Sequence, residues 1–104
     1  MEQRITYITA TEKEGIRAEI LYAVGHAHTA GEELLLFVPR EKEKQMSALH
    51  ALLRTFKKQG KIRLFYDPDS TGKGGTAESY LLNKYPSLFE NMHTAGDGRI
   101  FVCI

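Results

Sequence analysis

The feature that most constrains this fold is a continuous apolar run, Leu34–Val38 (LLLFV), which ends at Pro39. A stretch with helical spacing of its apolar residues lies on each side of this run. Strands that are apolar at consecutive positions are typical of parallel sheets, because helices cover both faces of such sheets. The run therefore predicts an α/β protein in which strands alternate with amphipathic helices.

Three more strand-like segments complete this alternation. The predicted strands are Arg4–Ala10, Leu34–Val38, Ile62–Tyr66 and Arg99–Ile104. The predicted helices start near Thr11, Glu41 and Thr76, and we expect them to end at Gly31, at Gly60 and before Pro86. Thr11 and Glu14 have the spacing of a capping box, and Leu88–Met92 continues as a short helical piece.

The order β-α-β-α-β-α-β predicts a three-layer, four-stranded, mostly parallel sheet of the Rossmann-like, doubly wound type. The simplest such order places the second, first, third and fourth strands side by side. In this order the first and third strands are neighbours at the switch point, where ligands bind in open α/β sheets.

The composition fits a single soluble domain. The chain has 104 residues, is 42% hydrophobic and 26% charged, and has a net charge of +1, so a domain that binds nucleic acid by bulk charge alone is not expected. The single Cys103 suggests a reducing compartment. No apolar run approaches the ~20 residues of a membrane span, and the N-terminus lacks a signal-peptide core. We therefore expect a cytoplasmic protein without a membrane segment.

Carboxylates follow both strands at the expected switch point. Glu12 and Glu14 lie in the turn TEKEG after the first strand, and Asp67 and Asp69 lie in DPDSTGKGGT after the third. Several carboxylates at one edge cannot all stay ionised without compensation, and a hard cation such as Mg²⁺ is the usual partner. The alternative is that these residues only cap helices and turns.

Other motifs match the same stretch less well. The calcium-loop pattern nearly fits from Asp67 to Glu78, but a strand precedes it and Gly74 replaces an apolar residue. The Asp-x-Asp-x-Thr spacing is also found in haloacid-dehalogenase-like phosphotransferases, which need a much longer chain. A Walker loop is excluded because the chain has no Gly-Lys-Ser/Thr.

The segment LFYDPDSTGKGGTAESYL resembles the Asp-Pro-Asp-x-x-Gly segment of the Toprim domain, as found in type IA topoisomerases. The turn TEKEG occupies the place of the Toprim glutamate, although its Glu-Gly pair, Glu14-Gly15, lies further along than usual. The order and spacing of elements are similar over nearly the whole chain.

This resemblance implies Mg²⁺-dependent phosphoryl transfer on nucleic acid, as in a small nuclease. Asp67 and Asp69 would hold the metal, and Glu12 or Glu14 would act as general acid or base or complete the metal shell. A phosphate would bind at the helix N-terminus, to Lys73 and to the backbone amides near Gly74, Gly75 and Thr76. Since topoisomerases and primases need further domains, a multidomain partner is also expected.

Two other functions stay open. One is a non-catalytic module that binds a phosphorylated small ligand, and the other is a protein-interaction domain, with a free edge strand that could support a homodimer. We interpret the basic cluster Lys57, Lys58, Lys61 and Arg63 as a solvated helix end. His50 has no partner visible in the sequence, and Cys103 is expected to be a buried small hydrophobic residue.

Overall fold

A computed structural model describes residues 4–67, 76–86 and 99–104. Asp69, Lys73, Gly74 and Gly75 lie outside the described residues, as does the helical piece expected at Leu88–Met92. The metal-binding role of Asp69 and the phosphate-binding role of the glycine-rich loop therefore stay predictions.

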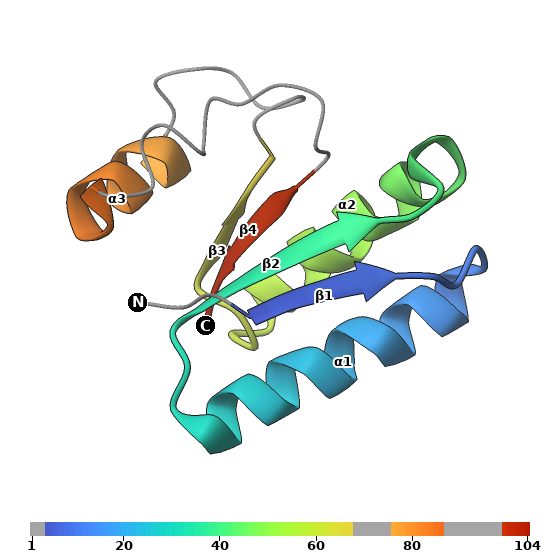
Figure 1. The fold of residues 1–104 in the computed structure, drawn as a ribbon, viewed down its shortest axis with the longest axis horizontal. Coiled ribbons are helices and arrows are strands. Elements are labelled where there is room, and N and C mark those ends of the chain that lie inside the picture. Colours follow the sequence, from blue (N-terminus) through green and yellow to red (C-terminus); the bar gives the residue numbers. More distant parts are fainter. Residues whose placement is uncertain (1–3, 68–75, 87–98) are drawn as a thin grey trace.

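The expected alternation of strands and helices is present (Figure 1). The strands are β1 (Arg4–Ile8), β2 (Leu34–Pro39), β3 (Leu64–Tyr66) and β4 (Ile100–Cys103), and the helices are α1 (Lys13–Ala30), α2 (Lys42–Lys58) and α3 (Thr76–Lys84). Gly31 ends α1 in the left-handed conformation with a φ of 72°, and Gly60 follows α2 with a φ of 76°. Both positions favour glycine, which has no Cβ to clash there.

The start of α1 differs from the prediction. The N-cap is Glu12 rather than Thr11, and its side chain makes no capping hydrogen bond. The expected capping box of Thr11 and Glu14 is therefore wrong. The backbone of this turn is held instead by side chains from elsewhere in the chain, which are described below.

The sheet is mixed, which corrects the expectation of a mostly parallel sheet. Its strand order is β1-β2-β4-β3, with β1 and β2 parallel and β4 antiparallel to both of its neighbours, β2 and β3. The expected order, with the first and third strands adjacent, is wrong. β4 is buried along its whole length, so it occupies an inner position between β2 and β3.

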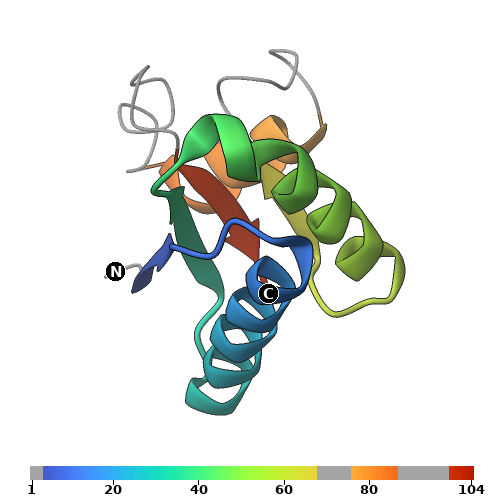
Figure 2. The ribbon, with the colours of Figure 1, turned by 90° about the vertical axis from the view of Figure 1, so that its right-hand side faces the viewer.

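Helices cover both faces of the sheet. α1 and α2 pack on one face and α3 packs on the other (Figures 1 and 2). Alternate residues of β2 point into the two cores, since Leu35 and Phe37 face α1 and α2 whereas Leu34 and Leu36 face Leu81 of α3. β1, β2 and β3 run in the same direction, so their carboxyl ends lie at one end of the sheet.

Candidate functional site

The predicted carboxylates follow strands that lie at opposite edges of the sheet. Glu12 and Glu14 are exposed at the start of α1, directly after β1, whereas Asp67 directly follows β3. β2 and β4 lie between these two strands (Figure 1). Three strand spacings of about 4.8 Å separate the edges by about 14 Å. The observed strand order therefore does not support the prediction that Glu12 and Glu14 lie close to Asp67.

The turn after β1 is organised by Glu19 of α1, a residue that sequence reasoning missed. Its carboxylate accepts hydrogen bonds from the backbone N–H of Thr9 at 3.0 Å, from the Thr9 hydroxyl at 2.6 Å and from the N–H of Ala10 at 3.2 Å. These bonds satisfy backbone donors that have no partner strand at the sheet edge. Glu19 therefore fixes the turn before α1, whereas a capping box would pair the first N–H groups of the helix itself.

Gln45 of α2 holds the same turn from the other side and is completely buried. Its Nε2 donates to the carbonyl oxygens of Ile8 at 2.8 Å and Ala10 at 2.6 Å, and its Oε1 accepts from the N–H of Glu41 at 2.8 Å. A buried amide in a helix is stable only when its donors and acceptors are paired, as they are here. The hydrogen bonds of Gln45 thus connect the end of β1 to the start of α2.

Asp67 is the one completely buried acidic residue among those that the structure describes. Its Oδ2 lies 2.7 Å from Nε2 of His50 on α2, and the His50 side chain is 16% exposed. Because a carboxylate only accepts, the imidazole donates this bond. The ring of His50 also meets Phe65 of β3 edge-on, with centroids 6.0 Å apart. Asp67 is therefore held by α2 at the end of β3.

The described residues do not by themselves form the metal centre that the Toprim resemblance implies. No group of three or more His, Cys, Asp or Glu side chains among them could hold a metal ion. Asp67 is buried against an imidazole, and the two glutamates follow the opposite edge strand. Mg²⁺ also accepts one or two carboxylates with water and phosphate oxygens. Of the two aspartates predicted to hold the metal, only Asp67 lies among the described residues.

A basic hollow lies beside β3, on the same edge as Asp67. It has a volume of about 480 Å³ and is lined by Arg54, Lys57, Lys58 and the half-buried Phe65. On α2, Arg54, Lys57 and Lys58 follow His50 by four, seven and eight residues, so these side chains share one helical face. The three cations therefore border the ring of Phe65, which His50 also contacts edge-on.

The segment that contains this hollow is locally basic. No acidic residue occurs between Glu43 and Asp67, although this segment contains six Lys and Arg residues, of which Arg54, Lys57 and Lys58 line the hollow. The balanced net charge of +1 hides this local excess. A local excess of cations attracts polyanions even on a protein that is nearly neutral overall.

Sequence reasoning found only part of this site. It singled out Lys57 and Lys58 as a solvated helix end but did not include Arg54 or Phe65, and it found no partner for His50. The spacing of His50 and Arg54 on one helical face was visible in the sequence. The contact between α2 and the end of β3 was not, because it depends on the strand order.

No family model, no curated protein and no solved structure matches this chain. Within the ranges that the structure describes, no helix has the length and apolar character needed to cross a membrane.

Proposed function

We propose that this chain binds single-stranded nucleic acid at the basic hollow beside β3. The observation that carries the proposal is the arrangement of Arg54, Lys57 and Lys58 around the half-buried ring of Phe65. Proteins that bind single strands combine cations that follow the phosphates with aromatic rings on which bases stack. This hollow contains both kinds of group on rigid elements, α2 and β3.

The number of cations sets the expected strength of binding. Three phosphate contacts to a single strand correspond to a slope of about −2 in log K against log salt concentration, at about −0.7 for each contact. Binding without sequence preference of this size has a Kd of about 10⁻⁴ to 10⁻⁶ M at physiological salt. Stacking of a base on Phe65 would add about 1–3 kcal/mol.

The test is fluorescence anisotropy with a labelled oligothymidylate, titrated at several salt concentrations. Lys57→Gln/Lys58→Gln should reduce the salt slope by about 1.4, since two contacts are lost. Lys13→Gln/Lys44→Gln changes the net charge equally but alters exposed residues outside the hollow, so it should leave the slope unchanged. Equal weakening by the two double variants would mean that binding follows bulk charge, and the proposal would then fail.

A second variant tests the aromatic contribution separately. Phe65→Leu keeps an apolar side chain on β3 but removes the stacking surface. We expect it to weaken oligonucleotide binding about fivefold or more while the salt slope stays the same. An affinity equal to that of the wild type would remove base stacking from the proposal and leave only phosphate binding.

Metal-dependent phosphoryl transfer is the second candidate function, and Asp67 is the observation that favours it. This buried carboxylate lies at the carboxyl end of β3, the strand whose Phe65 lines the basic hollow. In such a reaction Asp67 and Asp69 would hold Mg²⁺, which would polarise a phosphate oxygen, and Glu12 and Glu14 would play no part. Titration with Mg²⁺ or Mn²⁺ should then shift the amide resonance of Asp67, and Asp67→Asn should abolish oligonucleotide cleavage but not binding. Without a metal-dependent shift, this second candidate is excluded.

A further inference from the structure

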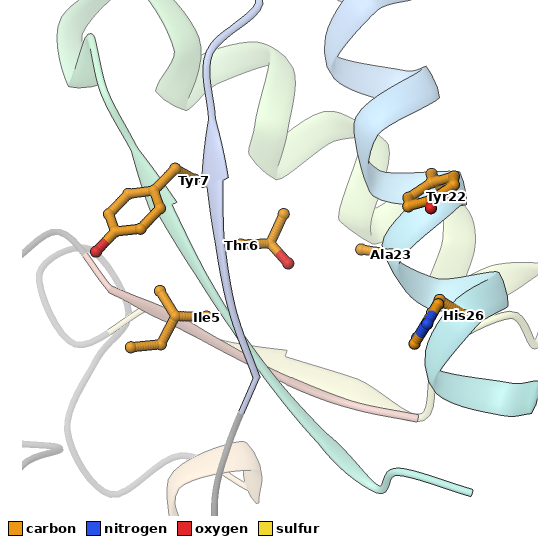
Figure 3. A pocket seen from close by; sticks show the side chains of 6 residues that line it. All are labelled: Ile5, Thr6, Tyr7, Tyr22, Ala23 and His26. Atoms are coloured by element: carbon orange, nitrogen blue, oxygen red, sulfur yellow. The ribbon is translucent and has the colours of Figure 1, made fainter. Parts of the chain in front are cut away.

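Three exposed large apolar side chains gather at the opposite edge of the sheet. Among the described residues, Ile5, Tyr7 and Tyr22 are the large hydrophobic residues with high exposure, at 44%, 50% and 77%. All three line one hollow of about 420 Å³ along the outer edge of β1, with Tyr22 on the α1 side and Ile5 and Tyr7 on the other side (Figure 3). Exposed apolar residues on both sides of an edge strand can contact the alternate side chains of an added strand.

The outer edge of β1 offers main-chain groups to an additional strand. The N–H of Arg40 donates to the carbonyl of Ile8 at 3.0 Å, so the main-chain groups of Ile8 point toward β2. Those of Ile5 and Tyr7 point the opposite way, since orientation alternates along a strand. β1 is an edge strand, and within the described part of the chain no strand pairs with its outer side.

The two edges of the sheet differ in how well they are protected. β3 has only three residues and follows the exposed Arg63, which is typical of an edge that avoids further pairing. β1 has five residues, and Ile5–Ile8 contains no charge and no proline. β1 is therefore the edge that can accept another strand.

The walls of the hollow define what an added strand would meet on each face. Thr6 points toward α1, where Ala23, Tyr22 and His26 line the hollow, whereas Ile5 and Tyr7 point to the other face of the sheet (Figure 3). On that second face the guanidinium of Arg40 lies 4.5 Å from the centre of the Tyr7 ring. An added strand would thus face Tyr22, Ala23 and His26 of α1 on one side and the guanidinium of Arg40 on the other.

A second copy of the chain, paired through β1, would not match the charge of this edge. In such a pair, β1 of one copy would lie against β1 of the other, and β1 (Arg4–Ile8) contains no acidic residue. The guanidinium of Arg40 would then have no carboxylate of the added strand on its face of the sheet. A segment of another protein that carries acidic residues therefore fits this edge better than a second copy does.

We propose that an extended peptide segment of a partner protein binds along β1 as a fifth strand. Its side chains alternate between apolar residues, which face Tyr22, Ala23 and His26, and acidic residues, which face Arg40. Main-chain hydrogen bonds to Ile5 and Tyr7 provide affinity, and the alternate side chains provide specificity, as in other cases of strand addition.

The expected size of this interface sets the affinity. A segment of about five residues is about 17 Å long and would bury on the order of 1,000 Å² in total, which is the size of a weak, transient interface. A Kd of about 10–100 μM is consistent with binding of this kind. The proposal does not depend on nucleic-acid binding, because it concerns the other edge of the sheet.

The experiment is selection from a displayed library of random octapeptides against the whole chain. Enriched peptides should alternate apolar and acidic residues, and a synthetic copy should shift the amide resonances of Ile5 and Tyr7. Every second backbone N–H of the bound peptide would face β1. Methylation of those nitrogens should abolish binding because it removes main-chain donors, whereas methylation of the other alternate set should not. Failure to enrich any peptide, or enrichment of peptides that shift other resonances, would overturn the proposal.

Two variants with a matched control place the binding in the hollow. Tyr22→Ala should weaken the selected peptide about tenfold, whereas Arg17→Ala, an exposed residue of the same helix outside the hollow, should not. Arg40→Gln should remove the preference for acidic residues. Retention of full affinity by Tyr22→Ala would contradict the proposal, as would a dimer through β1 detected by sedimentation.

Discussion

Gln45 offers the sharpest test of how this fold is held together. Its completely buried amide joins the end of β1 to the start of α2 through three hydrogen bonds. We expect Gln45→Leu to lower the free energy of unfolding by about 2–4 kcal/mol, although leucine has a similar volume and is more apolar.

The expected loss of stability follows from the backbone groups that lose their hydrogen bond to Gln45. The carbonyl of Ile8 keeps its hydrogen bond from the N–H of Arg40 at 3.0 Å, so it stays satisfied. The carbonyl of Ala10 and the N–H of Glu41 lose the partner that Gln45 provides. An unsatisfied group that is at least partly buried costs about 1–2 kcal/mol, and the two together give the expected loss.

Gln45→Glu is a nearly isosteric variant that separates hydrogen bonding from packing. Near neutral pH its carboxylate would face two carbonyl oxygens and repel both of them, so this variant should be less stable than Gln45→Leu. The protonated acid can donate to one carbonyl, and burial raises the pKa of such a carboxyl group. The stability deficit should therefore shrink as the pH falls and grow as the pH rises through the pKa in the folded state.

Urea denaturation, followed by far-UV circular dichroism, measures these differences. Gln59→Leu makes the same substitution at the exposed end of α2 and should change stability by less than about 0.5 kcal/mol. If Gln45→Leu behaved like this control, the three bonds would contribute nothing net to stability. The same reasoning would then fail for Glu19, which holds the other side of the turn.

Three further predictions concern single positions. Gly15→Ala should destabilise the chain, since its Cβ would lie 2.7 Å from a side-chain carbon. Gly25→Ala in the same helix meets nothing within 4 Å and should stabilise the chain by about 0.5–1 kcal/mol. Equal effects of the two variants in thermal unfolding would contradict this. Asp67→Asn and His50→Gln should show a coupling of about 1.5–3 kcal/mol in a double-mutant cycle, and a coupling near zero would remove the pair as a stabilising contact. Burial raises the pKa of the Cys103 thiol from 9.0 to about 11. The contribution of this thiol to stability is therefore present below pH 9.0 and lost as the pH rises toward about 11. Alkylation of Cys103 near neutral pH should need unfolding, and rapid labelling of the folded chain would refute this.

The helices and strands could be predicted from local patterns. Apolar residues at helical spacing define the buried face of α1, and the glycines at Gly31 and Gly60 end or follow helices as expected. α3 ends at Lys84, before Pro86, because proline cannot continue a helix and restricts the residue before it. Cys103 is buried, as its apolar neighbours indicated.

The strand order was predicted wrongly, although the sequence contained a useful signal. Leu34–Phe37 of β2 and all of β4 are buried, and these strands occupy the centre of the sheet. β1 gave no such signal, because Ile5 and Tyr7 are exposed in the structure although they are hydrophobic residues like the buried Ile8. The rule for doubly wound sheets assumed parallel pairing throughout, whereas RIFVCI carries the apolar content of an inner strand and pairs antiparallel.

The position of β4 decides how the candidate sites relate to one another. A parallel sheet with the first and third strands adjacent would open one cleft at its switch point, and both acidic turns would line it. With β2 and β4 inserted, the turn after β1 and the end of β3 belong to different edges. Glu19 and Gln45 stabilise the first edge without exposing a reactive group, and His50 holds Asp67 at the second edge beside the basic hollow. The proposed binding of nucleic acid and the proposed strand addition would therefore use separate edges of this protein, so a ligand at one edge would not need to displace a ligand at the other.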